Sequence, residues 1–334
     1  MSATRPIPTA RRLLAVVVLV PLLAALALWA FAWPAARTAP RDLPLGVAGP
    51  AAAAAQVEER LSRRDGAFEI HRYADETAAR DAIEDREVYG AVVVTEQGPR
   101  LLTASAASPT VAQLLRQAVN GQAAAEGTQV PTVDVVPAPE NDPRGAALGA
   151  SVLPLTMAGM AAGAAVTLLG MRGTRAVTAL VGASALVGLA AAAIAHSWLG
   201  VLTGDWWAEA GVLGLATLAV SGGVAGLAAL LGPAGIGLAS AVVMLLGNPF
   251  SGAAGAPQLL PEPAGAIGQW LPPGAGASLL RSVSYFDGAA ATGPLLTLVW
   301  WAALGLGAVL LGAALKSRAR EAEPAAGREP ALAG

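Results

Sequence analysis

Two long apolar runs joined by a short turn constrain the fold more than any other feature of this chain. Neither residues 147–169 nor residues 176–195 contain a charged side chain, and each run reaches the roughly 20 residues that a helix needs to cross a bilayer. Backbone groups in lipid must bond to one another, so we expect helices. The turn at residues 171–175 contains Arg172 and Arg175. Short loops rich in arginine stay in the cytoplasm, so this turn should face inward.

The composition also indicates an integral membrane protein. The chain is 55% hydrophobic and 13% charged, whereas soluble domains are about 25% charged. A net charge of -2 leaves no basic surface for a nucleic acid, and we expect the lipid bilayer as the main partner. The absence of cysteine excludes disulfides, thiolate metal sites and cysteine catalysis.

The N-terminal segment predicts a first span. An apolar run at residues 13–33 follows Arg11 and Arg12. A cleaved signal peptide is the alternative, because Ala30-Phe31-Ala32 resembles a cleavage site. The run exceeds the roughly 7–15 residues of a signal-peptide core, which favours an uncleaved anchor. Residues 1–34 are therefore expected to form a cytoplasmic N-terminus and the first transmembrane helix.

Residues 35–145 differ in character and predict a separate domain. They contain most of the acidic residues, and strand-like and helical patterns alternate along them. We expect strands at residues 43–48, 67–73, 89–94, 100–104 and 132–136, and helices at residues 51–64, 75–85 and 110–126. Asp75 or Thr77 would cap the second of these helices. About 100 residues suffice for one small α/β domain, and its place between an outward and an inward helix predicts an extracytoplasmic location.

The remaining spans give about six transmembrane helices, five of them in a membrane domain at residues 146–316. Further runs lie at residues 210–231, 236–246 and 289–315. The second is short, so it should extend back into the preceding turn or re-enter.

Charge at the helix ends predicts cytoplasmic N- and C-termini. The residues that would set this topology are Arg11, Arg12, Arg172, Arg175, Lys316, Arg318 and Arg320. Asp205, Glu209, Glu262 and Asp287 fall in expected outer loops, with Arg281 as the single arginine there. Residues 317–334 are rich in Ala, Pro and Glu and predict a disordered cytoplasmic tail.

The outer loop at residues 248–288 is punctuated by prolines. It predicts two short amphipathic helices that dip into the outer leaflet, or alternatively an ordered loop with an apolar underside. The residues expected in contact with the leaflet are Pro249, Trp270, Pro272, Pro273, Leu279, Leu280, Val283 and Phe286. Arg281, Ser282 and Ser284 would lie off the apolar stripe.

Small residues spaced four apart recur in the expected spans. The pairs are Gly159 with Gly163, Ser184 with Gly188, and Gly222 with Gly226. Such pairs allow helices to approach closely in lipid. Packing within the chain is the simpler interpretation, and a dimer face is the alternative.

No catalytic, cofactor or metal site is predicted. His196 falls at the outer end of a span, where an interfacial polar side chain is the simpler interpretation. His71 with Glu69 and Asp75 is a weak metal candidate, because one histidine beside carboxylates on a solvated strand is usually surface. No G-x-x-x-x-G-K-[ST] motif occurs, so the chain has no P-loop for ATP. We do not expect an enzyme.

Three stretches of the outer loop carry a resemblance. Asn248-Pro249-Phe250, Leu259-Leu260-Pro261 and Gln269-Trp270-Leu271-Pro272-Pro273-Gly274 are similar to the proline-rich outer loop of permeases from ATP-binding-cassette exporters of the second type. The order of parts resembles bacterial members with a large extracytoplasmic domain after the first helix. The resemblance implies a dimeric pore in the bacterial plasma membrane, driven by a separate cytoplasmic ATPase, that moves a hydrophobic or amphipathic substrate outward.

The expected cytoplasmic surface is smaller than such a permease requires for its motor. It consists of about 12 residues before the first span and the five-residue turn at 171–175. A second hypothesis is therefore a non-transporting membrane protein whose extracytoplasmic domain binds or scaffolds envelope partners.

Overall fold

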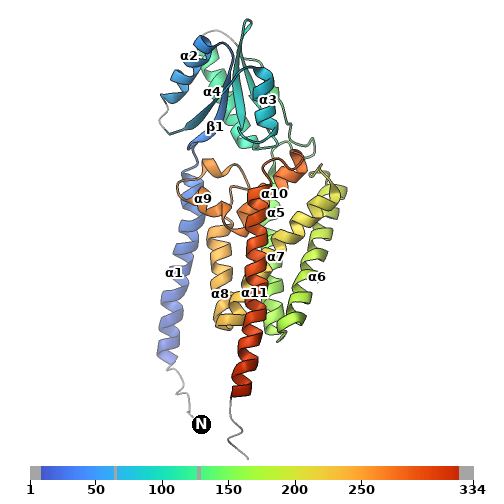
Figure 1. Ribbon diagram of the computed structural model, residues 1–334. Coiled ribbons are helices and arrows are strands. Elements are labelled where there is room, and N and C mark those ends of the chain that lie inside the picture. Colours follow the sequence, from blue (N-terminus) through green and yellow to red (C-terminus); the bar gives the residue numbers. More distant parts are fainter. Residues whose placement is uncertain (1–8, 64–65, 126–128, 323–334) are drawn as a thin grey trace, which may run out of the picture.

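An α/β unit lies on one end of a bundle of long helices (Figure 1). The computed structural model describes residues 9–63, 66–125 and 129–322. The long helices are α1 (Thr9–Ala36), α5 (Ala146–Leu168), α6 (Gly173–Ala192), α7 (Trp206–Leu231) and α11 (Thr292–Ala322). Each contains a stretch that is long and apolar enough to cross a membrane. The first turn of α1 and the last turn of α11 lie at the end of the bundle opposite the α/β unit.

Within the described residues, five helices have the length of a span, rather than the expected six or so. The short run forms α8 (Pro233–Val242), which a π-helical turn, η2 (Val243–Gly247), continues. Helix α8 starts directly after Gly232, whose φ of +71° suits glycine, so the helix does extend back into the turn. Even so it is shorter than the roughly 20 residues of a full span.

The α/β unit follows the predicted pattern closely. Its strands are β1 (Leu43–Ala48), β2 (Phe68–Tyr73), β3 (Gly90–Thr95), β4 (Gly98–Thr103) and β5 (Thr132–Asp134), and its helices are α2 (Ala51–Ser62), α3 (Glu76–Glu84) and α4 (Pro109–Ala125). The sheet order is β2-β1-β3-β4-β5, in which only the β3–β4 pairing is antiparallel. Of the two cap candidates Asp75 is the cap, since its carboxylate accepts the N–H of Ala78 at 2.9 Å.

Both faces of the sheet are buried, because alternate side chains of each strand point to opposite sides. Leu45 and Leu101 pack with residues of α2 and α4 on one face. Ala91 and Leu102 pack with α3 on the other. Buried residues of the outer loop join both cores, Ala256 and Leu259 on the first face and Phe286 on the second.

Helix α7 is the centre of the bundle, with 67% of its span buried. Glycines of the surrounding helices meet its backbone closely. A Cβ on Gly163 of α5 would lie 2.6 Å from the Ser221 carbonyl oxygen, and one on Gly305 of α11 would lie 2.3 Å from the Gly222 carbonyl carbon. The three pairs of small residues all face neighbouring helices of the same chain. Packing within the chain therefore accounts for these pairs.

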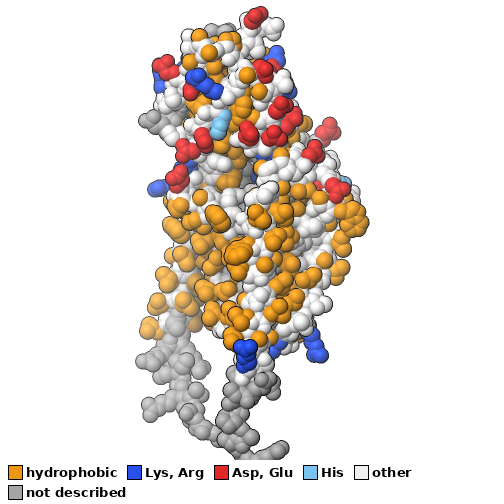
Figure 2. Space-filling model, viewed as in Figure 1, with side chains coloured by type: hydrophobic (Ala, Val, Ile, Leu, Met, Phe, Trp, Pro, Cys, Tyr) orange, Lys and Arg blue, Asp and Glu red, His pale blue; other side chains and the backbone are white. Residues whose placement is uncertain are grey.

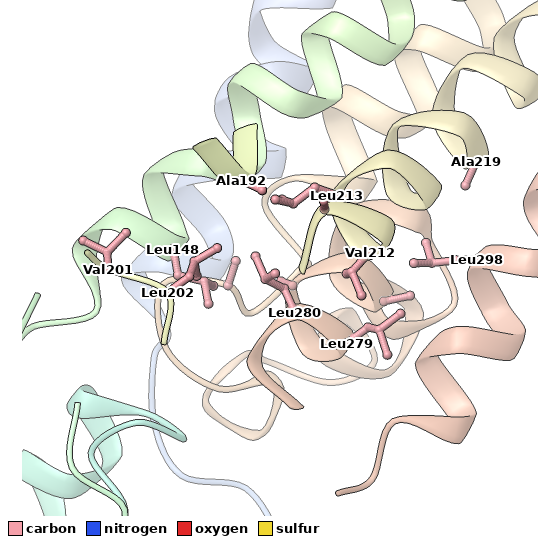
Figure 3. Packing of buried hydrophobic residues seen from close by; sticks show 14 residues of the cluster. Leu148, Ala192, Val201, Leu202, Val212, Leu213, Ala219, Leu279, Leu280 and Leu298 are labelled. Atoms are coloured by element: carbon pink, nitrogen blue, oxygen red, sulfur yellow. The ribbon is translucent and has the colours of Figure 1, made fainter. Parts of the chain in front are cut away.

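The outer loop contains a 3₁₀ turn, η3 (Pro257–Leu259), and two helices, α9 (Ala264–Gln269) and α10 (Pro272–Tyr285). Helix α10 is buried on both its apolar and its polar sides. Leu279 and Leu280 pack against α7 (Figure 3), and the polar Arg281, Ser282 and Ser284 are buried as well. Arg86 of the α/β unit contacts Ser282 on this helix.

Charged side chains are distributed unevenly along the molecule. Arg172, Arg175, Lys316 and Arg318 are exposed, at the end away from the α/β unit, and the visible acidic side chains gather at the other end (Figure 2). The side chains of Arg11, Arg12 and Arg320, and the tail beyond residue 322, lie outside what the structure describes.

An ionisable pair joins α6 and α7 at their ends near the α/β unit. Helix α6 continues as a π-helical segment, η1 (Ala193–Trp198), and Nδ1 of its His196 lies 2.8 Å from Oε2 of Glu209. The other oxygen of Glu209 accepts the N–H of Gly204 at 2.9 Å. Glu209 is completely buried and belongs to the first turn of α7, not to the outer loop as expected.

Replacing Gly305 with alanine should loosen the bundle. The new methyl group would overlap the α7 backbone, which we expect to cost about 1–3 kcal/mol and to lower the melting temperature in detergent. Gly307→Ala is the matched control on the same helix, because no atom of another helix lies within 4 Å of the position that its methyl group would take. Equal melting temperatures for the two variants would contradict α7–α11 backbone packing.

Replacing His196 with alanine should destabilise the protein because it leaves the buried Glu209 carboxylate without its partner. We expect a cost of about 2 kcal/mol, since breaking a fully buried pair costs roughly 3–5 and the His196 side chain is 30% exposed. In a Glu209→Gln background the same replacement should cost much less. A double-mutant cycle on melting in detergent measures this, and identical costs in both backgrounds would show that the pair is not coupled.

Candidate functional site

A cavity of about 880 Å³ lies where the α/β unit, the outer loop and α11 meet. We call it the junction cavity. Its polar part is lined by Arg86, Glu87, Tyr89, Gln258, Gln269, Ser278 and Arg281, and its apolar part by Trp270, Leu296, Val299, Trp300 and Trp301 among others. Its volume is in the range of about 300–1,000 Å³ that is typical of small-molecule sites.

Hydrogen bonds between the α/β unit and the outer loop fix the upper wall. The backbone N–H groups of Ala39 and Arg41, which follow α1, donate to the carbonyl oxygens of Leu259 and Gln258 at 3.0 and 2.9 Å. The hydroxyl of Tyr89 donates to Oε1 of Gln258 at 2.9 Å. The loop is thereby held to the segment that leads into the sheet, and the cavity wall is formed in advance of any ligand.

Arg86 reaches from the α/β unit into the outer loop. It follows the C-terminal end of α3 with a φ of +62°, a left-handed conformation that is strained for any residue with a Cβ. Its Nη1 donates to the Ser278 carbonyl oxygen at 3.0 Å and to the Ser282 hydroxyl. Its guanidinium carbon lies 5.2 Å from the centre of the Phe286 ring, a cation–π distance.

Of the two arginines of the cavity, Arg281 is buried and Arg86 is half-buried. Burial, and then the neighbouring Arg281, lowers the pKa of Arg86 to about 10, so this side chain stays protonated at neutral pH. Burial also lowers the pKa of Arg281. The Arg281 side chain is only 5% exposed, and its Nη2 donates to the Ala253 carbonyl oxygen at 3.1 Å.

Neither arginine forms an ion pair with a carboxylate in the described part of the chain. The one acidic residue of the lining, Glu87, is exposed and accepts a hydrogen bond from the Tyr73 hydroxyl at 3.3 Å. Buried arginines are usually paired. The upper part of the junction cavity is therefore electropositive.

The floor of the cavity is held by side chains of the outer loop. Gln269 donates to the Ser251 carbonyl oxygen at 2.9 Å and accepts the Ser278 hydroxyl at 2.6 Å. The indole N–H of Trp301 donates to the Trp270 carbonyl oxygen at 2.8 Å. Below this point the wall is apolar and belongs to α11, where Leu296 and Trp300 are 62% and 64% exposed.

The outer-loop residues that the sequence singled out do not form one site. Trp270 lines the junction cavity, whereas Pro272, Pro273 and Leu280 lie between α10 and α7, and Pro249 faces α1 and α5. Contact of these residues with the outer leaflet stays a prediction.

The sequence did not predict that Arg86 and Arg281 line the same cavity. Arg281 stood out in the sequence as the single arginine of the outer loops, and nothing local marked Arg86 as its neighbour.

The weak metal candidate does not form a ligand cluster. His71 lies 3.5 Å from Glu69 at the surface of the α/β unit. No cluster of three potential metal ligands occurs among the residues that the structure describes.

A second open cavity, of about 970 Å³, lies at the opposite end of the bundle. It is lined by residues 169–175, Thr178, Ala179 and Ala313, which belong to the α5–α6 turn, to the start of α6 and to α11. Arg172 and Arg175 both border it. We call it the turn cavity.

Comparison with known proteins gives one match. The model of a family described as ABC-2 family transporter protein matches residues 11–316. Searches of curated proteins and of solved structures found no match. The family match extends from α1 through the α/β unit to α11, in agreement with the resemblance seen in the outer loop. The chain therefore belongs to the ABC-2 family of transporter membrane proteins.

Proposed function

We propose that this chain is the permease subunit of an exporter that moves a hydrophobic or amphipathic substrate outward, with a separate ATPase as its motor. The junction cavity is the observation that carries this proposal. It has a polar end under the α/β unit and an apolar end on the exposed flank of α11. A molecule with both kinds of surface could pass between lipid and the outer face by this route.

The proposed orientation places the α/β unit outside the cell and both termini in the cytoplasm of a bacterium. Its support is the positive charge of Arg172, Arg175, Lys316 and Arg318 at the end opposite the α/β unit. Such charge is retained on the cytoplasmic side during insertion.

The proposed motor is a second protein, since permeases of this family are typically not catalytic. The turn cavity is the proposed docking surface. Its support is its position at the end that we assign to the cytoplasm, and the exposed apolar Met171 beside two arginines. A second permease subunit would complete the pore, as the family resemblance implies.

A scaffold that does not transport is the second candidate function. The shortness of the α5–α6 turn favours it, because α5 ends at Leu168 and α6 begins at Gly173. Under this hypothesis the α/β unit would bind envelope partners and no ATPase would be needed.

Reporter fusions test the orientation. Replacing both Arg172 and Arg175 with glutamate should disturb insertion of the α5–α6 hairpin, because the turn would lose its cytoplasmic retention signal. Alkaline phosphatase fused near residue 90 should be active in the parent protein. An unchanged topology in the double variant, or an inactive fusion near residue 90, would contradict the assignment.

Capture of the motor tests the function. The tagged chain, solubilised in mild detergent, should retain a protein with a P-loop ATPase motif. Met171→Asp should lower its recovery about tenfold, because a charge would enter the proposed interface. Ile267→Asp is the matched control at the other end of the bundle, since Ile267 is 40% and Met171 41% exposed. Failure to capture any such ATPase, or equal losses in the two variants, would favour the scaffold.

A further inference from the structure

The junction cavity is lined by two arginines and one acidic residue, the exposed Glu87, which forms an ion pair with neither arginine in the described part of the chain. Arg86 and Arg281 line it together, and they lie close enough for Arg281 to lower the pKa of Arg86. A guanidinium has five N–H donors. For Arg281 the described residues provide one acceptor, the Ala253 carbonyl, and for Arg86 they provide an acceptor carbonyl and a hydroxyl.

Two desolvated cations side by side repel each other, and burial without a counter-charge is unfavourable. An anion between them would relieve both costs. Arginine is also the side chain best suited to phosphate and carboxylate, because its planar donors can bind two oxygens at once. The charge of the site therefore specifies the charge of the ligand.

The backbone conformation of Arg86 also indicates that its side chain has a function. Position 86 follows the C-cap of α3 and has the left-handed conformation in which helices usually place glycine. An arginine there is strained, and strained backbone is often kept at positions where the side chain has a function. Glycine would satisfy the local geometry, but it would lose the cation and its contacts with Ser278, Ser282 and Phe286.

The apolar wall of the cavity on α11 indicates the chemistry of the rest of the ligand. Below Gln269 and Trp270 the cavity runs along Leu296, Val299 and Trp300, within the span of α11. This wall is apolar and exposed at the depth where acyl chains would surround α11. A small hydrophilic anion would leave it unused, whereas an acyl chain would cover it.

We infer that the junction cavity binds an anionic lipid, with its acidic headgroup between Arg86 and Arg281 and its acyl chain along α11. Binding is a property of this chain alone. The further statement that such an amphiphile is the exported substrate rests on the proposed function.

The purified full-length chain in neutral detergent tests binding. The three probes are short-chain phosphatidic acid, phosphatidylcholine with the same chains, and inorganic phosphate, each titrated by calorimetry. Phosphatidic acid should bind saturably. Phosphatidylcholine, whose headgroup has no net charge, should bind about tenfold more weakly or worse, and phosphate alone should show no saturable binding.

Two variants test the assignment of the headgroup. Arg281→Gln removes the buried cation. Arg86→Gly removes the other cation and its hydrogen bonds to Ser278 and Ser282, while it relieves the left-handed backbone, and the melting temperature of each variant shows whether it is folded. Each should weaken phosphatidic acid binding about tenfold or more. Arg144→Gln is the control, because Arg144 is exposed at the same end and does not line the cavity.

Each outcome bears on one proposal. Wild-type binding by a folded Arg86→Gly variant, equal binding of both lipids, or equal binding of free phosphate would overturn the anionic-lipid site. These results would leave the exporter proposal standing if an ATPase is captured. Arginine-dependent lipid binding without any ATPase would instead keep the site and remove the exporter.

Discussion

Close contact between helix backbones around α7 is the interaction on which the rest of the structure depends. Lipid chains are as apolar as leucine, so the hydrophobic effect does not drive helices together within a bilayer. What remains is dispersion, which grows steeply as surfaces approach. Gly163 and Gly305 allow α5 and α11 to reach the α7 backbone. The outer loop packs against α7 and α11, and the α/β unit packs against the outer loop. The positions of the loop and of the α/β unit therefore depend on the packing of helices around α7.

The outer loop is the joint between the membrane helices and the α/β unit. Leu279 packs in the bundle, Phe286 in one face of the sheet and Leu259 in the other. A segment shared by three cores has little surface left for solvent, which explains why the polar side chains of α10 are buried. Ser282 accepts a hydrogen bond from Arg86 of the α/β unit, and Arg281 donates to the Ala253 carbonyl oxygen of the outer loop itself. The same packing places Arg86 and Arg281 in the lining of the junction cavity.

Much of the fold could be predicted because its signals are local. The strands of the α/β unit were predicted from patterns within a few residues, and Asp75 was among the cap candidates. Predictions failed where the environment of a side chain depended on a distant element. Glu209 was assigned to a loop, although it is buried beside His196. The sequence placed Ser282 off the apolar stripe of α10, but it did not indicate the contact with Arg86, which is 196 positions away.

The sequence by itself determined which segments are helices that suit lipid, where the α/β unit is inserted and which helix ends carry positive charge. These properties follow from uncharged length, from side-chain alternation and from composition, each of which can be read within some 20 residues. Only the tertiary structure decided that Arg86 and the α10 helix meet, since Arg86 and Ser278 are 192 positions apart. Contacts over that separation depend on how whole units pack, and no local pattern encodes the cavity that they form.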